Sequence, residues 1–197
     1  DGKKNKVDNT TPESFDLQKY FAKMAEKSVS HCFMEVSSHA LELNRVDNIS
    51  IDVGIFTNLT RDHLDFHKTM EGYYQAKKKL FHLTRINNII NVDDEYGARL
   101  YKELKEEGIN AISVAIDKEA TIRASNLITA KDGTSFDINI QGTIKKAHVN
   151  TPGKFSVLNS LGAFGAAYAL GTDVDKIIEA LGEIKGVTGR FEMLENN

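Results

Sequence analysis

The fold is decided by residues 34–81, whose sequence is MEVSSHALELNRVDNISIDVGIFTNLTRDHLDFHKTMEGYYQAKKKLF. Two short apolar runs, residues 31–36 and 51–57, have the length and composition of buried strands. Polar residues accompany the end of each run, beginning at Glu35 in the first and at Asn58 in the second. Ligands bind at strand ends in open α/β sheets, because the loops there separate and leave a crevice. We therefore expect a ligand site at these strand ends, of the kind that handles metal and phosphate.

The rest of the chain alternates between helix and strand patterns. Apolar residues at helical spacing predict helices at residues 17–24, 70–81, 96–104, 157–168 and 174–181, and short apolar runs predict strands at 88–92 and 111–115. Asp16 or Ser14 fits the cap of the first helix, and Thr172 or Asp173 that of the last, with Gly171 as the stop between the final two. This order predicts an α/β fold with a mainly parallel sheet flanked by helices.

The pattern changes between residues 122 and 150, where apolar and polar residues alternate over residues 135–140. Phe136 and Ile138 share one face, and the pair Asp132-Gly133 before them is a strong hairpin turn signal. Gly142 predicts a second turn. We expect one domain over residues 1–197, with a small antiparallel β appendage at 122–150.

Composition excludes several classes of protein. A hydrophobic content of 41% and a charged content of 27% are ordinary for a globular protein. The net charge of -3 leaves no basic footprint, which argues against nucleic-acid binding. No apolar run approaches the ~20 residues that a membrane span needs, no signal peptide is visible, and the single Cys32 fits a reducing cytoplasm. Because the chain opens on Asp1 without an initiator Met, we expect it to be a piece of a longer protein.

Each polar residue near the strand ends has a structural explanation beside a functional one. An unpaired carboxylate is costly to bury, so Glu35 either marks an exposed strand end, pairs with Arg45 or Arg61, or binds a ligand. Ser37, Ser38 and His39 either cap a following turn or belong to the site. The residues after the strand at 88–92 are equally compatible with an ordinary turn, and they are Asn91, Asp93 and Asp94.

The segment after the second strand offers a possible metal site. His63 and His67 are four positions apart, so a helix would place them on one face, as in metal-binding histidine pairs. Asp62 and Asp65 add carboxylates to the same segment. An acidic loop with two histidines and no metal is the alternative.

Lys77 lies on the apolar stripe of the helix predicted at 70–81. Its stem could simply cover apolar surface while the ammonium group reaches water. However, Lys78 and Lys79 already give this helix solvent-facing charge. A partly buried lysine beside two cations should have a lowered pKa, which favours the neutral, nucleophilic amine.

Several strings in the chain closely resemble the central domain of the Mur ligases. Glu-Val-Ser-Ser-His at 35–39 and Asn-Leu-Thr-Arg-Asp-His at 58–63 are specific to the branch that adds the third residue of the peptidoglycan stem peptide. The other matching strings are Asn9-Thr10-Thr11-Pro12, Gln75-Ala76-Lys77, Asn91-Val92-Asp93-Asp94-Glu95, Pro152-Gly153-Lys154-Phe155 and Gly186-Val187-Thr188-Gly189-Arg190-Phe191-Glu192. The resemblance covers residues 9–192, and the end of its last string is shared with folylpolyglutamate synthetases.

The resemblance implies a P-loop/Rossmann-like fold and ATP-dependent formation of an amide bond. ATP would phosphorylate a carboxylate of UDP-N-acetylmuramoyl-L-alanyl-D-glutamate, and the amine of diaminopimelate or lysine would displace phosphate from the acyl phosphate. Mg²⁺ would neutralise the charge on the transferring phosphoryl group. The resemblance also implies a cytoplasmic, usually monomeric parent enzyme without nucleic-acid or membrane partners.

The same resemblance implies roles for individual residues. Glu35 and His63 would each ligate a Mg²⁺, and Lys77 would be carbamylated, so that it presents an anionic oxygen to the second metal. The UDP-muramoyl-dipeptide would be held by Asn9, Thr10, Thr11, Ser37 and Arg45. The nucleotide would be bound by Asn159 near adenine and by Arg190 nearer ribose and phosphate.

One family element is missing from the sequence. No Gly-x-x-x-x-Gly-Lys-Ser/Thr string, the phosphate-binding loop, occurs anywhere in the chain. We expect that loop and a UDP-binding domain upstream of Asp1, and an amino-acid-binding domain after the last residue. On this interpretation the chain is a truncated central domain that is inactive alone.

Two other hypotheses remain. A folylpolyglutamate synthetase-like ligase is disfavoured by the Asn9-Thr10-Thr11 and Ser37-Ser38-His39 strings. A metal-dependent phosphohydrolase would use Asp62, His63, Asp65 and His67 with Mn²⁺ or Zn²⁺, and it would act without ATP.

Overall fold

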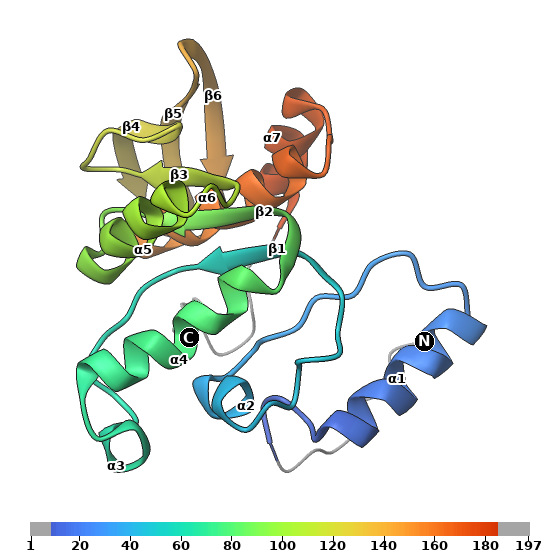
Figure 1. Cartoon of the computed structure of the whole chain (residues 1–197). Helices are drawn as coiled ribbons and strands as arrows, with labels where there is room; N and C mark the ends of the chain where they lie inside the picture. The colour runs from blue at the N-terminus through green and yellow to red at the C-terminus, as the bar shows by residue number, and fades with distance from the viewer. Residues whose placement is uncertain (1–8, 185–197) are drawn as a thin grey trace, which may run out of the picture. The chain divides into compact units, whose positions relative to one another are not determined.

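The structure, a computed structural model, describes residues 9–184 and divides into two compact units (Figure 1). The first, which we call the helical unit, comprises the described residues 9–51 and 61–83. The second, the sheet unit, comprises the described residues 52–60 and 84–184.

The helical unit contains four helices among its described residues: α1 (Ser14–Glu26), α2 (Ser38–Glu42), α3 (Leu64–His67) and α4 (Met70–His82). Its small apolar core consists of Leu17, Leu41 and Val46, with Val36 and Leu80 packed against them. Helices α1 and α4 confirm the helices predicted from apolar spacing. Leu17 is the only fully buried residue of α1, whereas α4 buries Tyr73, Tyr74, Ala76 and Phe81.

The strand predicted at residues 31–36 is wrong. This segment is coil, Cys32 is exposed, and Phe33 is 88% exposed. A strand exists through the ladder of backbone hydrogen bonds to its neighbour, and residues 31–36 make no backbone–backbone hydrogen bond to another described segment. Residues 31–36 thus have the apolar composition of a strand but no neighbouring strand to pair with.

The predicted cap of α1 is also wrong. Glu13 is the N-cap, with extended backbone and no side-chain cap hydrogen bond, so Ser14 and Asp16 lie inside the helix. The Glu13 carboxylate forms an ion pair with Arg45 at 2.7 Å. The Glu13 side chain is thus engaged by Arg45 and does not cap α1.

The sheet unit is built on one six-stranded sheet in the order β1-β2-β3-β4-β5-β6. The strands are β1 (Ile51–Phe56), β2 (Thr84–Asn91), β3 (Ala111–Ala115), β4 (Ile122–Ala130), β5 (Gly133–Ile140) and β6 (Thr143–Val149). Strands β2, β3 and β4 pair in parallel, whereas β4, β5 and β6 pair antiparallel. The predicted antiparallel strands thus exist, and they continue the same sheet, drawn from yellow-green to orange in Figure 1. The α/β fold expected from the sequence is confirmed.

Helices α5 (Glu95–Glu106) and α6 (Lys154–Ala169) cover opposite faces of this sheet. Ile55 of β1 lies against Gly162 of α6, while its neighbour Phe56 lies against Gly97 of α5. Successive strand residues point to opposite faces, so the two helices must as well. The main core, which includes Ile89, Val114, Ile122, Ile138, Leu161 and Phe164, lies between the sheet and its helices.

Helix α7 (Val174–Glu183) packs against β6 and α6. Its predicted N-cap is confirmed, because the Asp173 carboxylate accepts hydrogen bonds from the backbone N–H groups of Asp175 and Lys176 at 3.1 and 3.2 Å. Gly171, the predicted stop of α6, has a φ of 83°, which favours glycine. Among residues 9–184, no helix has both the length and the apolar character needed to cross a membrane.

Candidate functional site

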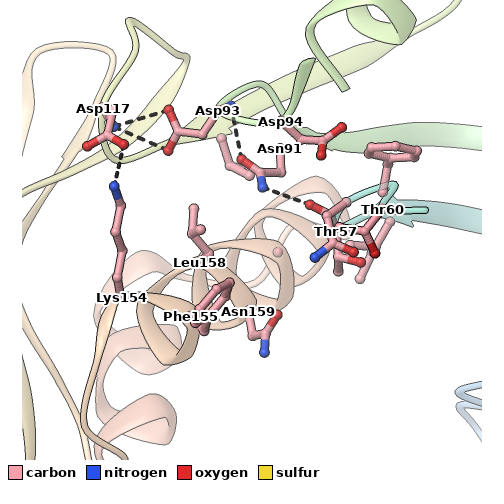
Figure 2. Close-up of a pocket in the computed structure, with 15 residues that line it drawn as sticks. Thr57, Thr60, Asn91, Asp93, Asp94, Asp117, Lys154, Phe155, Leu158 and Asn159 are labelled. Atoms are coloured by element: carbon pink, nitrogen blue, oxygen red, sulfur yellow. Dashed lines mark hydrogen bonds and ion pairs between the residues drawn. The ribbon is translucent and has the colours of Figure 1, made fainter. Parts of the chain in front are cut away.

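The sheet unit contains a cavity of about 330 Å³ where β1, β2 and β3 end (Figure 2). Residues after β1 and β2 form one side, and the first turns of α6 form the other. The lining residues are Ile55, Phe56, Thr57, Asn58, Thr60, Asn91, Asp93, Asp94, Val114, Asp117, Lys154, Phe155, Leu158, Asn159 and Gly162. The prediction that polar residues after successive strands gather at one sheet edge is thus confirmed for β1 and β2.

Asn91 and Asp94 build the rim of this cavity by holding backbone groups. The Asn91 amide donates to the carbonyl of Thr57 at 2.7 Å, and its oxygen accepts from the N–H of Asp93 at 3.1 Å. Asp94 caps α5 by accepting from Gly97 N–H at 2.9 Å, and it also accepts from Leu59 N–H at 3.3 Å. Both side chains join the loop after β1 to the loop after β2, which is the structural role left open by the sequence.

The Asp93 carboxylate is also engaged by backbone. It accepts hydrogen bonds from the N–H groups of Ile116, Asp117 and Lys118, at 2.7, 3.1 and 2.9 Å. These bonds fix the turn that follows β3. Asp93 is therefore a turn-forming residue whose oxygens already have donors.

The α6 side of the cavity also carries groups that are available to a ligand. Lys154 forms an ion pair with Asp117 across the cavity wall (Figure 2). Phe155 is 69% exposed, and the exposed Asn159 amide makes no hydrogen bond to the described residues. An aromatic ring one helical turn from a free amide can hold a flat heteroaromatic ring. Asn159 was predicted from the resemblance, whereas Phe155 was missed, although it stands in the quoted Pro152–Phe155 string.

In the helical unit, the structure brings together three of the predicted substrate-binding residues. Thr11 is fully buried, its hydroxyl donates to the carbonyl of Glu35 at 2.9 Å, and it accepts from Ser37 N–H at 2.9 Å. Arg45 donates to the carbonyl of Thr11 at 3.2 Å. Its Nε is buried and has no hydrogen-bond partner among the described residues. Thr11, Ser37 and Arg45 therefore form one cluster, while Asn9 and Thr10 precede it as exposed residues.

Ser37 also performs the structural role considered for it. It is the N-cap of α2, and its hydroxyl accepts from Ala40 N–H at 3.2 Å. The polar string after Glu35 thus begins a short helix. Because residues 31–36 form no strand, this string follows coil and not a strand end.

Five aromatic rings pack together in the helical unit, and we call them the histidine cluster: His39, His63, Phe66, His67 and Tyr73. The His67 ring stacks on Tyr73 with centroids 5.0 Å apart, and its Nε2 lies 2.8 Å from Ser38 Oγ. The His63 ring meets Tyr73 edge-on at 5.8 Å. Burial, followed by the charge of His39, lowers the pKa of His67, which favours its neutral form.

The prediction that His63 and His67 share one helix face is only partly correct. Helix α3 has one turn, His67 is its last residue, and His63 is its N-cap with a left-handed φ of 53°. His67 bonds to Ser38, and the described residues contain no group of three or more His, Cys, Asp and Glu side chains suited to a metal ion.

Lys77 is largely removed from water, as its position on the stripe predicted. Burial lowers the pKa of its amine, and the nearby charge of Glu35 partly opposes this effect. The predicted direction is therefore confirmed, but burial, and not Lys78 and Lys79, is the main cause. The amine lies 5.6 Å from the centroid of the Tyr73 ring. Glu35 does not pair with Arg45, which binds Glu13 instead.

Glu35, His63 and Lys77 thus all lie in the helical unit. Glu35 acts electrostatically on Lys77, and Tyr73 contacts both His63 and Lys77. Arg190, the last predicted site residue, lies outside the described residues.

The sequence is similar to that of characterised families over most of its length. A model of the Mur ligase middle domain matches residues 2–167. The chain is 48% identical over 186 residues to a UDP-N-acetylmuramoyl-L-alanyl-D-glutamate–2,6-diaminopimelate ligase of Alkaliphilus oremlandii, which covers 94% of the chain and 38% of that relative. A ligase of the same name from Alkaliphilus metalliredigens is 45% identical, over 93% of the chain and 37% of its own length.

The fold agrees with these matches. A solved structure of a ligase with the same name superposes with a TM-score of 0.88 at 25% identity, covering 98% of this chain and 40% of that one. The chain therefore spans about two fifths of the length of these relatives. On the family match over residues 2–167 and the agreement in fold, this chain belongs to the Mur ligase middle domain family.

Proposed function

We propose that this chain is the middle segment of an ATP-dependent ligase that adds diaminopimelate to UDP-N-acetylmuramoyl-L-alanyl-D-glutamate. The observation that carries the proposal is 48% identity to a ligase of that name over 94% of the chain. Because the chain spans 38% of that relative, the activity is proposed for a longer, cytoplasmic and monomeric protein that contains it. The role in peptidoglycan synthesis follows from the same similarity.

The cavity of the sheet unit would bind the adenine end of ATP. Phe155 offers a ring face, and Leu158 beside it adds apolar surface. The Asn159 amide can donate to and accept from a purine edge. Arg190 would contact ribose and phosphate, as the resemblance implies.

Glu35 would ligate one Mg²⁺, and His63 and a carbamylated Lys77 would ligate a second. Carboxylate and carbamate oxygens are the hard donors that Mg²⁺ prefers, whereas an ammonium group is no donor, so Lys77 fits this role only as a carbamate. The electrostatic effect of Glu35 on Lys77 supports neighbouring positions for these two side chains. Mg²⁺ bound there would neutralise charge on the phosphoryl group during its transfer.

Lys77 is suited to carbamylation by its surroundings. Burial lowers its pKa, which raises the fraction of neutral amine at a given pH. The ammonium group would first lose one proton to solvent. The neutral amine nitrogen would then form a bond to the carbon of CO₂, one C=O π bond would break, and the nitrogen would lose a second proton to solvent. The side chain would thereby change from a cation to an anion with oxygen donors.

The cluster of Thr11, Ser37 and Arg45 would hold the UDP-muramoyl-dipeptide, together with Asn9 and Thr10. Arg45 is mostly buried, and its guanidinium is already oriented by Thr11 and Glu13. Its unpartnered Nε supports a role in binding an anionic or carbonyl oxygen. The neutral hydroxyl groups nearby can accept or donate as the substrate requires.

The proposed reaction has two steps. A carboxylate oxygen of the D-glutamate residue attacks the γ-phosphorus of ATP, and ADP leaves with the bonding electrons. The diaminopimelate amine then attacks the acyl carbon, and inorganic phosphate leaves as the amide forms. The groups of the chain act by holding the reactants and by stabilising charge, which is how phosphoryl transfer is usually catalysed.

The competing hypotheses have less support. The relatives reported above name diaminopimelate, which favours it over lysine as the added amino acid. Their names also disfavour a folylpolyglutamate synthetase-like activity. A phosphohydrolase that used Nε2 of His67 as a metal ligand would have to break the bond of that nitrogen to Ser38.

The proposal is tested by incubating the full-length protein with ATP, Mg²⁺, the UDP-muramoyl-dipeptide and either diaminopimelate or lysine. We expect a product whose mass equals both substrates less one water, with one ADP released per amide and diaminopimelate preferred. ADP release that does not require the dipeptide would argue against the proposal. Amide formation only with lysine would correct the amino acid.

The metal assignment has its own test. Glu35→Gln and His63→Ala should each lower kcat of the full-length enzyme by roughly 100-fold or more, because a transition-state charge contact contributes several kcal/mol. Circular dichroism should show an intact fold. Normal turnover in a folded variant would return that residue to a structural role.

A further inference from the structure

The three segments that carry the candidate metal ligands are joined in the helical unit by one side chain, His67. Its Nε2 lies 2.8 Å from the hydroxyl of Ser38, which is 1% exposed and begins α2 three residues after Glu35. Its ring stacks on Tyr73 of α4 with an interplanar angle of 14°. The same ring therefore contacts α2 through a hydrogen bond and α4 through a stack.

The backbone of His67 is fixed as well. Its N–H donates to the carbonyl of His63 at 3.0 Å, and its own carbonyl accepts from Thr69 N–H at 2.8 Å. A Cβ at Gly72 would lie 2.7 Å from that carbonyl, so the first turn of α4 packs directly against it. Movement of His67 would therefore shift His63.

The position of His63 depends on such support. Its left-handed φ of 53° is uncommon for a residue with a side chain, and it persists only where neighbouring contacts hold it. Tyr73, which receives the His67 stack, meets the His63 ring at 5.8 Å and lies 5.6 Å from the Lys77 amine. His67 thus supports both His63 and Lys77 without contacting Lys77.

We propose that His67 is a positioning residue, whose hydrogen bond to Ser38 and stack on Tyr73 hold His63 and Lys77 in place relative to the Glu35–Ser38 segment. The inference rests on the proposed function for the metal ligands Glu35, His63 and Lys77 and for the identity of the reaction. Residues that orient metal ligands from behind typically change metal affinity or activity by about 10–100-fold when replaced. His67 and Ser38 act as a pair in this role.

The test measures Mn²⁺ binding to the full-length protein in the presence of ADP by electron paramagnetic resonance, alongside kcat. His67→Phe keeps the stack on Tyr73 but removes the hydrogen bond, and Ser38→Ala removes the same bond from its other end. We expect each to weaken Mn²⁺ binding about 10-fold, and the double variant to be no weaker than either single one. His67→Gln, which can still bond to Ser38, should recover part of the loss.

Lys79→Met is the matched control. Lys79 and Glu42 also join α2 to α4, at 2.8 Å, but this ion pair is exposed, and the variant breaks it while keeping the Glu42 charge that acts on His67. The control should lower thermal stability as much as Ser38→Ala or less, with unchanged Mn²⁺ affinity. If His67 had a purely structural role, every variant would lose thermal stability without a change in Mn²⁺ affinity. Mn²⁺ affinities of the His67 and Ser38 variants equal to that of the control would therefore overturn the proposal.

The remaining outcomes of the experiment also support or overturn the positioning role of His67. If His67→Phe does not fold, Ser38→Ala and His67→Gln carry the comparison. A wild-type protein that binds no Mn²⁺ overturns the positioning role. A wild-type protein that binds Mn²⁺, with the expected loss in the variants, but forms no amide overturns the proposed function and leaves the positioning role supported.

Discussion

At the scale of single residues, the chemistry of this chain depends on side chains held partly out of water. Lys77 is the main example, because burial lowers the pKa of an amine whose helix neighbours could have carried the solvent-facing charge. Phe155 is the opposite case, a large ring left 69% exposed at the edge of a cavity. The proposed function uses both side chains, the amine as a carbamate and the ring as a stacking surface for the base.

Lys77→Met should stabilise the fold while it abolishes ligase activity. Because the folded-state pKa is lowered, the charged amine destabilises the fold fully below that pKa, and the effect disappears as pH rises towards the unfolded value. We expect unfolding in CO₂-free buffer to require about 1 kcal/mol more in the variant at pH 7, with the difference shrinking as pH rises towards the unfolded-state pKa of a lysine, ~10.4. Thermal melts across this pH range check it.

Lys77→Arg provides the control for the carbamate. It keeps a positive charge and a long stem but cannot react with CO₂ in this way. We expect it to lose most of the full-length activity, whereas acetate should partly restore Lys77→Ala by supplying the missing oxygens. Wild-type turnover in Lys77→Arg would show that the side chain merely covers apolar surface.

Phe155→Ala should raise the KM for ATP of the full-length enzyme by roughly tenfold. Stacking of a base on an aromatic ring contributes about 1–3 kcal/mol, and the KM for the dipeptide should change little. Phe15→Ala is a close control, since Phe15 is 78% exposed and is likewise the second residue of its helix. Equal KM values for ATP in the two variants would remove Phe155 from the nucleotide site.

At the scale of elements, close packing of helices on neighbouring backbone determines the site. Helix α5 approaches the end of β2 so closely that a Cβ at Gly97 would lie 1.9 Å from the carbonyl of Asn91. The approach allows Asp94 to cap α5 and to hold Leu59 N–H with the same carboxylate. The N-terminus of α5 thereby fixes the loops after β1 and β2 on one side of the cavity.

Gly97→Ala should destabilise the chain by about 1–3 kcal/mol, as overpacking against backbone does. Gly182→Ala is the control, because Gly182 also lies in a helix but its nearest neighbour would be 4.0 Å from the new Cβ. That change should be neutral or stabilising by up to about 1 kcal/mol. Urea unfolding of both variants measures the difference, and similar stabilities would show that α5 can move away from β2.

At the scale of the whole molecule, the described residues form a cavity of about 330 Å³, and the sequence contains no phosphate-binding loop motif. Backbone N–H groups and a lysine of such a loop normally hold the β- and γ-phosphates. The relatives are more than twice as long as this chain. We therefore expect phosphate binding to be supplied by another segment of the longer protein.

The isolated chain should neither release ADP from ATP nor form the amide. Incubation with ATP, Mg²⁺ and both substrates, followed by chromatography of the nucleotides, measures this directly. The full-length protein under identical conditions is the positive control. ADP release that scales with the concentration of the chain and disappears in Asn159→Ala would contradict the prediction.

Much of the fold follows from the sequence alone, because apolar periodicity depends on which face of each element is buried. The spacing of Leu100 and Leu104 predicts α5, and both are fully buried. The run at 111–115 coincides with β3. The sequence also predicts that Asp173 caps α7, because its hydrogen-bond partners lie two and three residues away. Local interactions of this kind are contained in the local sequence.

Tertiary structure alone decided the contacts between distant segments. Residues 31–36 have an apolar strand pattern but remain coil, because a strand also needs a neighbour's hydrogen bonds. Nothing in the sequence around Ser38 indicates His67 as its partner. Lys77 was identified from its place on a helix stripe, yet the burial that lowers its pKa depends on tertiary packing. Sequence periodicity shows which residues face inward, whereas their partners depend on how the chain brings distant segments together.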